Sequence, residues 1–227
     1  MGFYVILIIA FVIFATLLPV WLRWKKSALY TMAIGGAVGA NIYNIGSYPI
    51  IDGNFIFGVD SIIYSLFMVC LMIMVFEFKV KTARTMLYVT IASIGFTGIV
   101  QFFALWGSGV LDAQVWWGLV SFAFSMLATC VAGEGLFYIY KVCSKHSWNK
   151  HLIFILCVLF GMIANSLIYF GGMAVVGQLG DNFGWGLLSS YIGKTLSISL
   201  GYIVWVLGNI IKNKRANLIN QTEAKKE

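Results

Sequence analysis

The sequence has few charged residues, prolines and histidines. Asp, Glu, Lys and Arg make up only 10% of its 227 residues, whereas about a quarter is usual for a soluble domain. Only two prolines and two histidines occur, while 61% of the residues are hydrophobic. No segment is long and polar enough to form a separate soluble domain. This composition indicates an integral membrane protein.

Motifs of common enzymes are also absent. The sequence has no GxxxxGK[ST], no GxGxxG after a predicted strand and no HExxH. The two histidines, His146 and His151, lie in a basic loop, where a catalytic or metal site is not expected. The four cysteines form no CxxC pair. We therefore expect no enzymatic activity, no cofactor and no bound metal.

Apolar runs that are long enough to cross a bilayer fill most of the chain. A helix needs about 20 apolar residues to span the hydrocarbon core. Seven such runs are present, at residues 3–22, 28–47, 55–77, 85–106, 115–140, 152–176 and 184–211. The sequence predicts an all-α bundle of seven transmembrane helices, in one domain over residues 1–215. A short cytoplasmic tail is expected over residues 216–227.

The segments between the runs alternate in charge. Four basic clusters, which hold all but one of the 15 Lys and Arg residues, border the runs at residues 23–26, 79–84, 141–150 and 212–226. The other three connections contain no Lys or Arg. The positive-inside rule then predicts an outside N-terminus and a cytoplasmic C-terminus, in a multi-pass protein of the plasma (inner) membrane. The net charge of +7 is therefore expected to meet lipid headgroups, not nucleic acid.

The second run contains overlapping pairs of small residues four positions apart. These pairs are Ala33 and Ala37, Gly35 and Gly39, and Gly36 and Ala40. Such spacing lets two helices approach closely in a membrane. We expect these residues to pack within the bundle. The alternative is docking onto another membrane subunit or a second copy of the chain.

Three ionisable residues lie inside the apolar runs. Lys194 is roughly 15 Å deep in the last run, Asp60 roughly 9 Å deep in the third, and Glu134 roughly 9 Å from the inner end of the fifth. Charges at such depth usually face a cavity or a pathway, so a functional role is the first hypothesis. The structural alternatives are a Lys194–Asp60 ion pair that only fixes helix packing, and a Glu134 carboxylate hydrated near the interface.

Three stretches of the chain resemble the queuosine precursor transporters, also called the vitamin uptake transporter (VUT) family. GNFIFGVDSIIY is similar to the family segment that leads to an intramembrane Asp, here Asp60. LFGMIANSLIYF resembles an FGxxxDT-type helix at Phe160, Gly161 and Ser166, and SSYIGKTLSISLGYIVWVLGNIIKNK resembles a closing helix at Tyr191 and Lys194. The likeness covers roughly residues 30–215.

The resemblance implies a transporter that imports a small flat polar metabolite, such as a 7-deazaguanine base or a vitamin-like compound. A carboxylate would accept hydrogen bonds from the amino edge of such a ring, a lysine would donate to its carbonyl, and aromatic rings would stack on its faces. The ligand-binding residues it implies are Asp60, Lys194, Asn165, Tyr191, Tyr64 and Glu134.

The chain departs from the family pattern at several of these positions. Asn165 and Ser190 stand where the family usually has Asp, Glu134 replaces Gln, and Tyr64 occupies an often acidic position. These differences leave the substrate open. They also motivate a second hypothesis, a membrane module that senses a ligand or docks a partner without transport. A retinal Schiff-base protein, with Lys194 as the retinal site, is a third reading that rests on topology alone.

Overall fold

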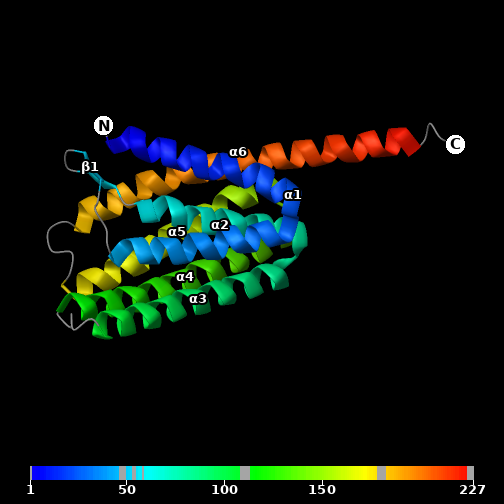
Figure 1. Cartoon of the computed structure of the whole chain (residues 1–227). Helices are drawn as coiled ribbons and strands as arrows, with labels where there is room; N and C mark the ends of the chain where they lie inside the picture. Colours follow the sequence, from blue (N-terminus) through cyan, green and yellow to red (C-terminus); the bar gives the residue numbers. More distant parts are fainter. Residues whose placement is uncertain are drawn as a thin grey trace.

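The computed structural model describes residues 2–45, 50–52, 55–57, 59–107, 113–177 and 183–223. Its helices form one elongated bundle (Figure 1). They are α1 (Gly2–Ile45), α2 (Val59–Phe78), α3 (Val80–Gly107), α4 (Ala113–Lys145), α5 (Lys150–Val175) and α6 (Phe183–Glu223). All six are long and apolar enough to cross a membrane, which indicates a multi-pass helical membrane protein.

Helix α1 consists of two arms that meet at Lys25. This residue has φ 48° and ψ −117°, outside the helical region. The first arm, residues 2–24, and the second arm, residues 26–45, run in opposite directions (Figure 1). The two arms correspond to the first two predicted apolar runs, because Lys25 lies in the short basic segment between them.

The third predicted run was wrong at its start. Residues 55–57 were expected in a helix, but Phe55–Phe57 is a strand, β2, that pairs antiparallel with β1 (Ile50–Asp52). The sequence IIDGNFIF explains this, because Gly-Asn between two runs of β-branched and aromatic residues is typical of a hairpin. Helix α2 therefore begins only at Val59, and β2 lies against α6. Apart from this short hairpin the described elements are helices, so the predicted all-α class is confirmed.

The last predicted run was too short. Helix α6 continues from Phe183 to Glu223, beyond the expected end at residue 211 and through most of the expected tail. Its final part projects away from the bundle (Figure 1). Residues 213–221 are exposed, so no apolar neighbour defines where this helix ends. Good helix-forming residues without a glycine or proline allow it to continue.

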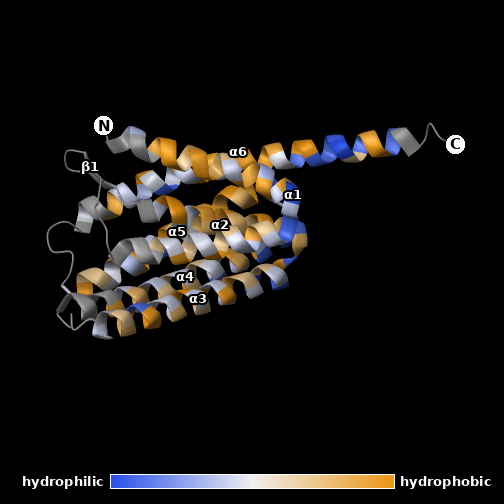
Figure 2. Cartoon of the chain, in the orientation of Figure 1, coloured by the Kyte–Doolittle hydropathy of each residue, from blue (hydrophilic) through white to orange (hydrophobic). Residues whose placement is uncertain are grey.

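One end of the bundle collects the basic clusters. It holds the turns at Lys25, Lys79 and Ser147, which are the non-glycine residues with positive φ in the described part of the chain. The projecting part of α6 leaves from the same end (Figure 1). Figure 2 shows hydrophilic residues concentrated there, whereas the helices between are largely apolar. We call this the basic end and the other, which carries the β-hairpin, the opposite end.

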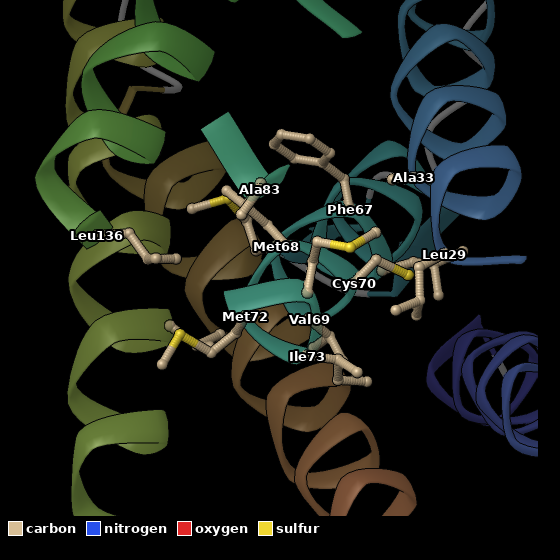
Figure 3. Packing of buried hydrophobic residues seen from close by; sticks show 14 of the residues in the cluster. Leu29, Ala33, Phe67, Met68, Val69, Cys70, Met72, Ile73, Ala83 and Leu136 are labelled. Carbon is tan, nitrogen blue, oxygen red and sulfur yellow. The ribbon is translucent and has the colours of Figure 1, made fainter. Parts of the chain in front are cut away.

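Helix α2 is the centre of the bundle. It packs against α1, α3, α5 and α6, and its residues 64–75 are all buried. Figure 3 shows Phe67, Met68 and Met72 of α2 packed among residues of the surrounding helices, including Leu29 and Leu136. Residues 66–76 of this helix are apolar on every side, and such a stretch is stable only when other helices or lipid surround it.

Two of the three pairs of small residues in the second arm of α1 pack within the bundle, as predicted, whereas the pair Gly35 and Gly39 does not. Ala33, Ala37 and Ala40 are buried. A side-chain carbon added at Gly36 would lie 3.2 Å from the carbonyl oxygen of Ile63 on α2. A larger residue at Gly36 would therefore require the two helices to shift apart by a few tenths of an ångström. Gly35 lies on the outer side of the arm, where an added carbon would meet nothing within 4 Å.

Candidate functional site: a polar centre between three helices

A group of buried polar side chains interrupts the apolar core where α2, α5 and α6 meet. We call this group the polar centre. Each of its members is at most 7% exposed. They are Ser61, Tyr64 and Ser65 on α2, Asn165 and Ser166 on α5, and Ser190 and Lys194 on α6. Buried polar groups are costly unless they are hydrogen-bonded, so their contacts decide what this site can do.

Lys194 is at the heart of the polar centre. Its side chain is 4% exposed. The ammonium Nζ donates to Asn165 Oδ1 at 3.1 Å and to Ser166 Oγ at 2.5 Å. It also lies 5.6 Å from the centroid of the Tyr64 ring, within the range of a cation–π contact. An amide, a hydroxyl and an aromatic face thus help to hold this charge inside the bundle.

Serine hydroxyls extend the site from α5 across α6 to α2. Ser190 Oγ lies 3.4 Å from Ser166 Oγ and 3.3 Å from Ser61 Oγ. Both distances are long for hydrogen bonds between hydroxyls, which are usually shorter than about 3.0 Å. Ser65 instead donates to the Ser61 carbonyl oxygen at 2.7 Å. The Ser190 hydroxyl is therefore loosely held and free to turn toward a better partner.

The Tyr64 hydroxyl has no hydrogen-bond partner in the described part of the chain, although it is buried. The Thr129 hydroxyl of α4 is a polar neighbour, but it does not meet Tyr64 in hydrogen-bond geometry and donates to the Ser125 carbonyl oxygen at 2.7 Å. An unpaired buried hydroxyl costs about 1–3 kcal/mol. The aromatic ring beside Lys194 thus carries a hydroxyl to which a ligand could supply the missing partner.

The predicted site residues separate into distinct groups. Lys194, Asn165 and Tyr64 come together in the polar centre. Tyr191 is partly buried on α6, one turn before Lys194, and it makes no hydrogen bond or ring contact with the described residues. Asp60 is the second residue of α2, one turn before Tyr64, but its side chain lies outside the described residues. The expected Lys194–Asp60 pair therefore belongs to that undescribed part.

Glu134 is not part of the polar centre. It faces α3, where Arg84 binds it through Nε–Oε1 at 3.0 Å and Nη2–Oε2 at 2.8 Å. The Tyr88 hydroxyl donates to Oε1 at 2.9 Å. The side chains of Arg84 and Glu134 are 47% and 32% exposed. The structure thus places Glu134 in a surface ion pair between α3 and α4, away from the helices that hold Lys194.

Sequence reasoning missed two members of the polar centre. Ser61 and Ser65 lie on one face of α2, four residues apart, but single serines are common in membrane helices and carry no specific signal. Ser166 and Ser190 appeared only through the family resemblance. Their proximity to Lys194 depends on how three helices are rotated against one another, which a sequence of helical runs does not reveal.

A layer of aromatic side chains separates the polar centre from the basic end. The ring centroids of Phe154 and Trp205 are 4.8 Å apart with planes at 16°, and Phe76 lies 5.1 Å from Trp205. On its outer side, the Tyr202 hydroxyl lies 2.9 Å from His151 Nδ1. We call these residues the aromatic layer. They come from α2, α5 and α6, the same helices that build the polar centre.

An ion pair closes the basic end beyond this layer. Lys212 of α6 binds Glu77 of α2, and its ammonium lies 4.1 Å above the Trp21 ring of α1. Between the polar centre and this pair, the residues of α2 are buried and apolar. The polar centre is thus closed toward the basic end in this conformation.

The described side chains of the polar centre offer an ammonium, an amide, serine hydroxyls and a tyrosine. Within the described ranges, no group of three His, Cys, Asp or Glu residues is placed to hold a metal ion. Comparison of the chain with protein-family models, curated protein sequences and solved structures finds no match. The class that fold and site define is a multi-pass helical membrane protein with a buried polar centre.

Proposed function

We propose that this protein is a membrane transporter that imports a small, flat, polar metabolite. The observation that carries the proposal is the polar centre. It combines a buried ammonium, loosely held hydroxyls and an unpaired Tyr64 hydroxyl in the interior of a membrane bundle. Polar groups at such depth mark substrate pathways more often than structural links. A queuosine precursor or a related vitamin-like compound is the proposed substrate class.

The proposed topology has seven crossings, with the basic end in the cytoplasm. A straight helix of the length of α1 would be roughly 66 Å long, about twice the hydrocarbon thickness, whereas each arm alone is about 30–35 Å. Counting the arms as two crossings puts the N-terminus outside and the C-terminus inside. The gathering of basic turns at one end supports this orientation.

The polar centre supplies the contacts that a planar heterocycle needs. The Lys194 ammonium can donate to a ring carbonyl, and the Asn165 amide can both donate and accept. The Tyr64 ring offers a stacking face and its hydroxyl an additional hydrogen bond. The family resemblance supports this class of substrate, and Asn165 and Ser190 would take the positions of the family's acids. Asp60 is the proposed acceptor for the amino edge of the ring.

Transport requires the site to open on alternate sides. The aromatic layer and the Glu77–Lys212 pair close the path toward the basic end. Substrate would therefore enter from the opposite end, and release into the cytoplasm would require these contacts to separate. The same three helices carry both the site and the closure, so a movement of α6 against α2 would couple ligand binding to opening.

Uptake into proteoliposomes tests this function. The purified protein is first screened with 7-deazaguanine bases, pterins and vitamins, because a ligand that binds only the folded state raises its thermal stability. The stabilising compound is then used in flux measurements. We expect Lys194→Met to abolish uptake while the protein still folds, and Lys214→Met in the projecting part of α6 to transport normally.

Three results separate the hypotheses. Uptake by Lys194→Met at the native rate would contradict the assignment of the site. Binding of the compound without flux would favour the ligand-sensing module. A visible absorption band after addition of retinal would favour the Schiff-base reading.

A further inference from the structure

Helices α3 and α4 carry a lateral surface near the basic end that combines positive charge with tyrosines. We propose that this surface binds the headgroup of an anionic phospholipid from the leaflet at the basic end. We call it the headgroup patch, and it consists of Lys81, Arg84 and Tyr88 on α3 and Glu134, Tyr138 and Lys141 on α4. The inference rests on the membrane location of the chain and is independent of transport.

The patch is one continuous surface because of helical spacing. Its residues on α3 are three and four positions apart, and those on α4 are four and three apart, so each set lies on one face of its helix. The Arg84–Glu134 pair joins the two faces. Glu134 is half-buried and the other five side chains are exposed, including Tyr138 at 70%.

The positions of these residues along the helix axes leave room for one phosphate between the cationic side chains. Helix α3 begins at the basic end and α4 ends there, so lower numbers on α3 and higher numbers on α4 lie nearer that end. With Arg84 and Glu134 at one level, Lys81 is roughly 4–5 Å closer to the basic end. Lys141 is roughly 10 Å closer by the same helical rise. The three cationic side chains therefore surround a level about 5 Å from the ion pair.

The hydrogen bonds to Glu134 fix the orientation of the Arg84 guanidinium, so that its other donors can bind a phosphate. A guanidinium carries five N–H donors, and Glu134 takes one from Nε and one from Nη2. Arg84 also lies over the Phe137 ring, 5.6 Å from its centroid. Its remaining donors are held in a fixed plane at the exposed side of the patch. Three cations against one carboxylate leave the patch positive, and a planar guanidinium matches phosphate oxygens.

The surface beyond the patch suits the acyl chains of the same lipid. Farther from the basic end, exposed residues on these two helices are apolar: Phe96 and Ile99 on α3, and Leu127 and Val131 on α4. A charged region next to the interface followed by an apolar region along the helices matches a phospholipid along its length. A soluble phosphate compound would use only the charged part.

Lipid binding to the purified full-length chain in a neutral detergent tests the proposal. Phosphatidylglycerol and phosphatidylcholine with the same acyl chains are titrated, and retained lipid is measured by native mass spectrometry. Lys81→Gln/Lys141→Gln is compared with Lys214→Gln/Arg215→Gln, which removes the same charge from the projecting part of α6. We expect the first double variant to weaken phosphatidylglycerol binding roughly tenfold or more, and the control to change it less than about twofold.

Glu134→Gln separates a built site from simple charge attraction. This variant makes the patch more positive, but it loosens the Arg84 guanidinium. We expect weaker binding of phosphatidylglycerol. Stronger binding, or equal losses in the two double variants, would overturn the proposal in favour of unspecific attraction. Equal affinity for the two lipids, or full displacement of phosphatidylglycerol by inorganic phosphate, would overturn the choice of a phospholipid.

Discussion

The polar centre and the Arg84–Glu134 pair show two ways in which charge is held within the helices of one chain. Lys194 is 4% exposed, and its contacts in the described residues include an amide, a hydroxyl and an aromatic ring. Arg84 and Glu134 are much more exposed and make two hydrogen bonds to each other. Charge-assisted bidentate pairs are strong and geometrically fixed. The two charges of the surface pair therefore neutralise each other without a further partner.

The polar centre holds unused hydrogen-bonding capacity in a buried place, whereas the remaining donors of Arg84 are at the exposed side of the surface pair. Its serine contacts are long, and the Tyr64 hydroxyl is unpaired in the described part of the chain. Such a site is costly in an empty protein, since buried polar groups lose their hydration. A ligand that supplies the missing partners would recover part of this cost. This difference supports the proposal that the metabolite binds at the polar centre, whereas Glu134 positions the Arg84 guanidinium.

The largest effect is expected for Ser166→Val. It removes the hydroxyl that lies 2.5 Å from the Lys194 ammonium and adds no acceptor. Hydrogen bonds to charged groups contribute about 1.5–3 kcal/mol, so we expect a loss of this size in the free energy of unfolding, measured in detergent. In a Lys194→Met background the same change is expected to cost less than about 1 kcal/mol. An equal loss of unfolding free energy in both backgrounds would show that the Ser166 hydroxyl does not stabilise the Lys194 ammonium.

The Arg84–Glu134 pair is expected to contribute less to the free energy of unfolding than the Ser166–Lys194 contact. A double-mutant cycle with Arg84→Gln and Glu134→Gln should give a coupling of about 1 kcal/mol or less, because both side chains are partly exposed. We expect uptake to remain near the native rate in both variants. Loss of uptake in Glu134→Gln, with stability retained, would show that Glu134 takes part in transport. Glu134 and Lys194 would then not differ in function as proposed.

Tyr64→Phe is expected to act on stability and binding in opposite directions. It removes a buried hydroxyl without a partner but keeps the ring beside Lys194. We expect the ligand-free protein to unfold at the same or a higher temperature, with a gain of up to about 1 kcal/mol. Ligand affinity should fall about tenfold if the hydroxyl contacts the ligand. A clear loss of stability without ligand would show that the hydroxyl already has a structural role.

The smallest effect on stability is expected for Ser190→Ala. Its two hydroxyl contacts, at 3.3 and 3.4 Å, are too long to contribute much. The free energy of unfolding should change by less than about 0.5 kcal/mol, measured beside Ser166→Val under the same conditions. A loss of unfolding free energy as large as that of Ser166→Val would instead show that the serines form one cooperative hydrogen-bond network.

Several features of the fold followed from local patterns. The apolar runs predicted the membrane helices because bilayer thickness sets their length, and the basic clusters predicted which turns share an end. The start of α2 and the end of α6 were misjudged. Hydropathy does not distinguish the aromatic strand β2 from a helix, and an exposed helix can continue past the membrane without changing the apolar pattern.

The sequence by itself determined that Lys194 is a charge inside a membrane helix, because a single basic residue in a long apolar run is visible without any neighbour. Only the tertiary structure decided that Asn165, Ser166 and Tyr64 contact Lys194. It also decided that Arg84 forms an ion pair with Glu134. These contacts depend on the rotation and close packing of helices that are distant in sequence, which periodicity along one chain does not encode.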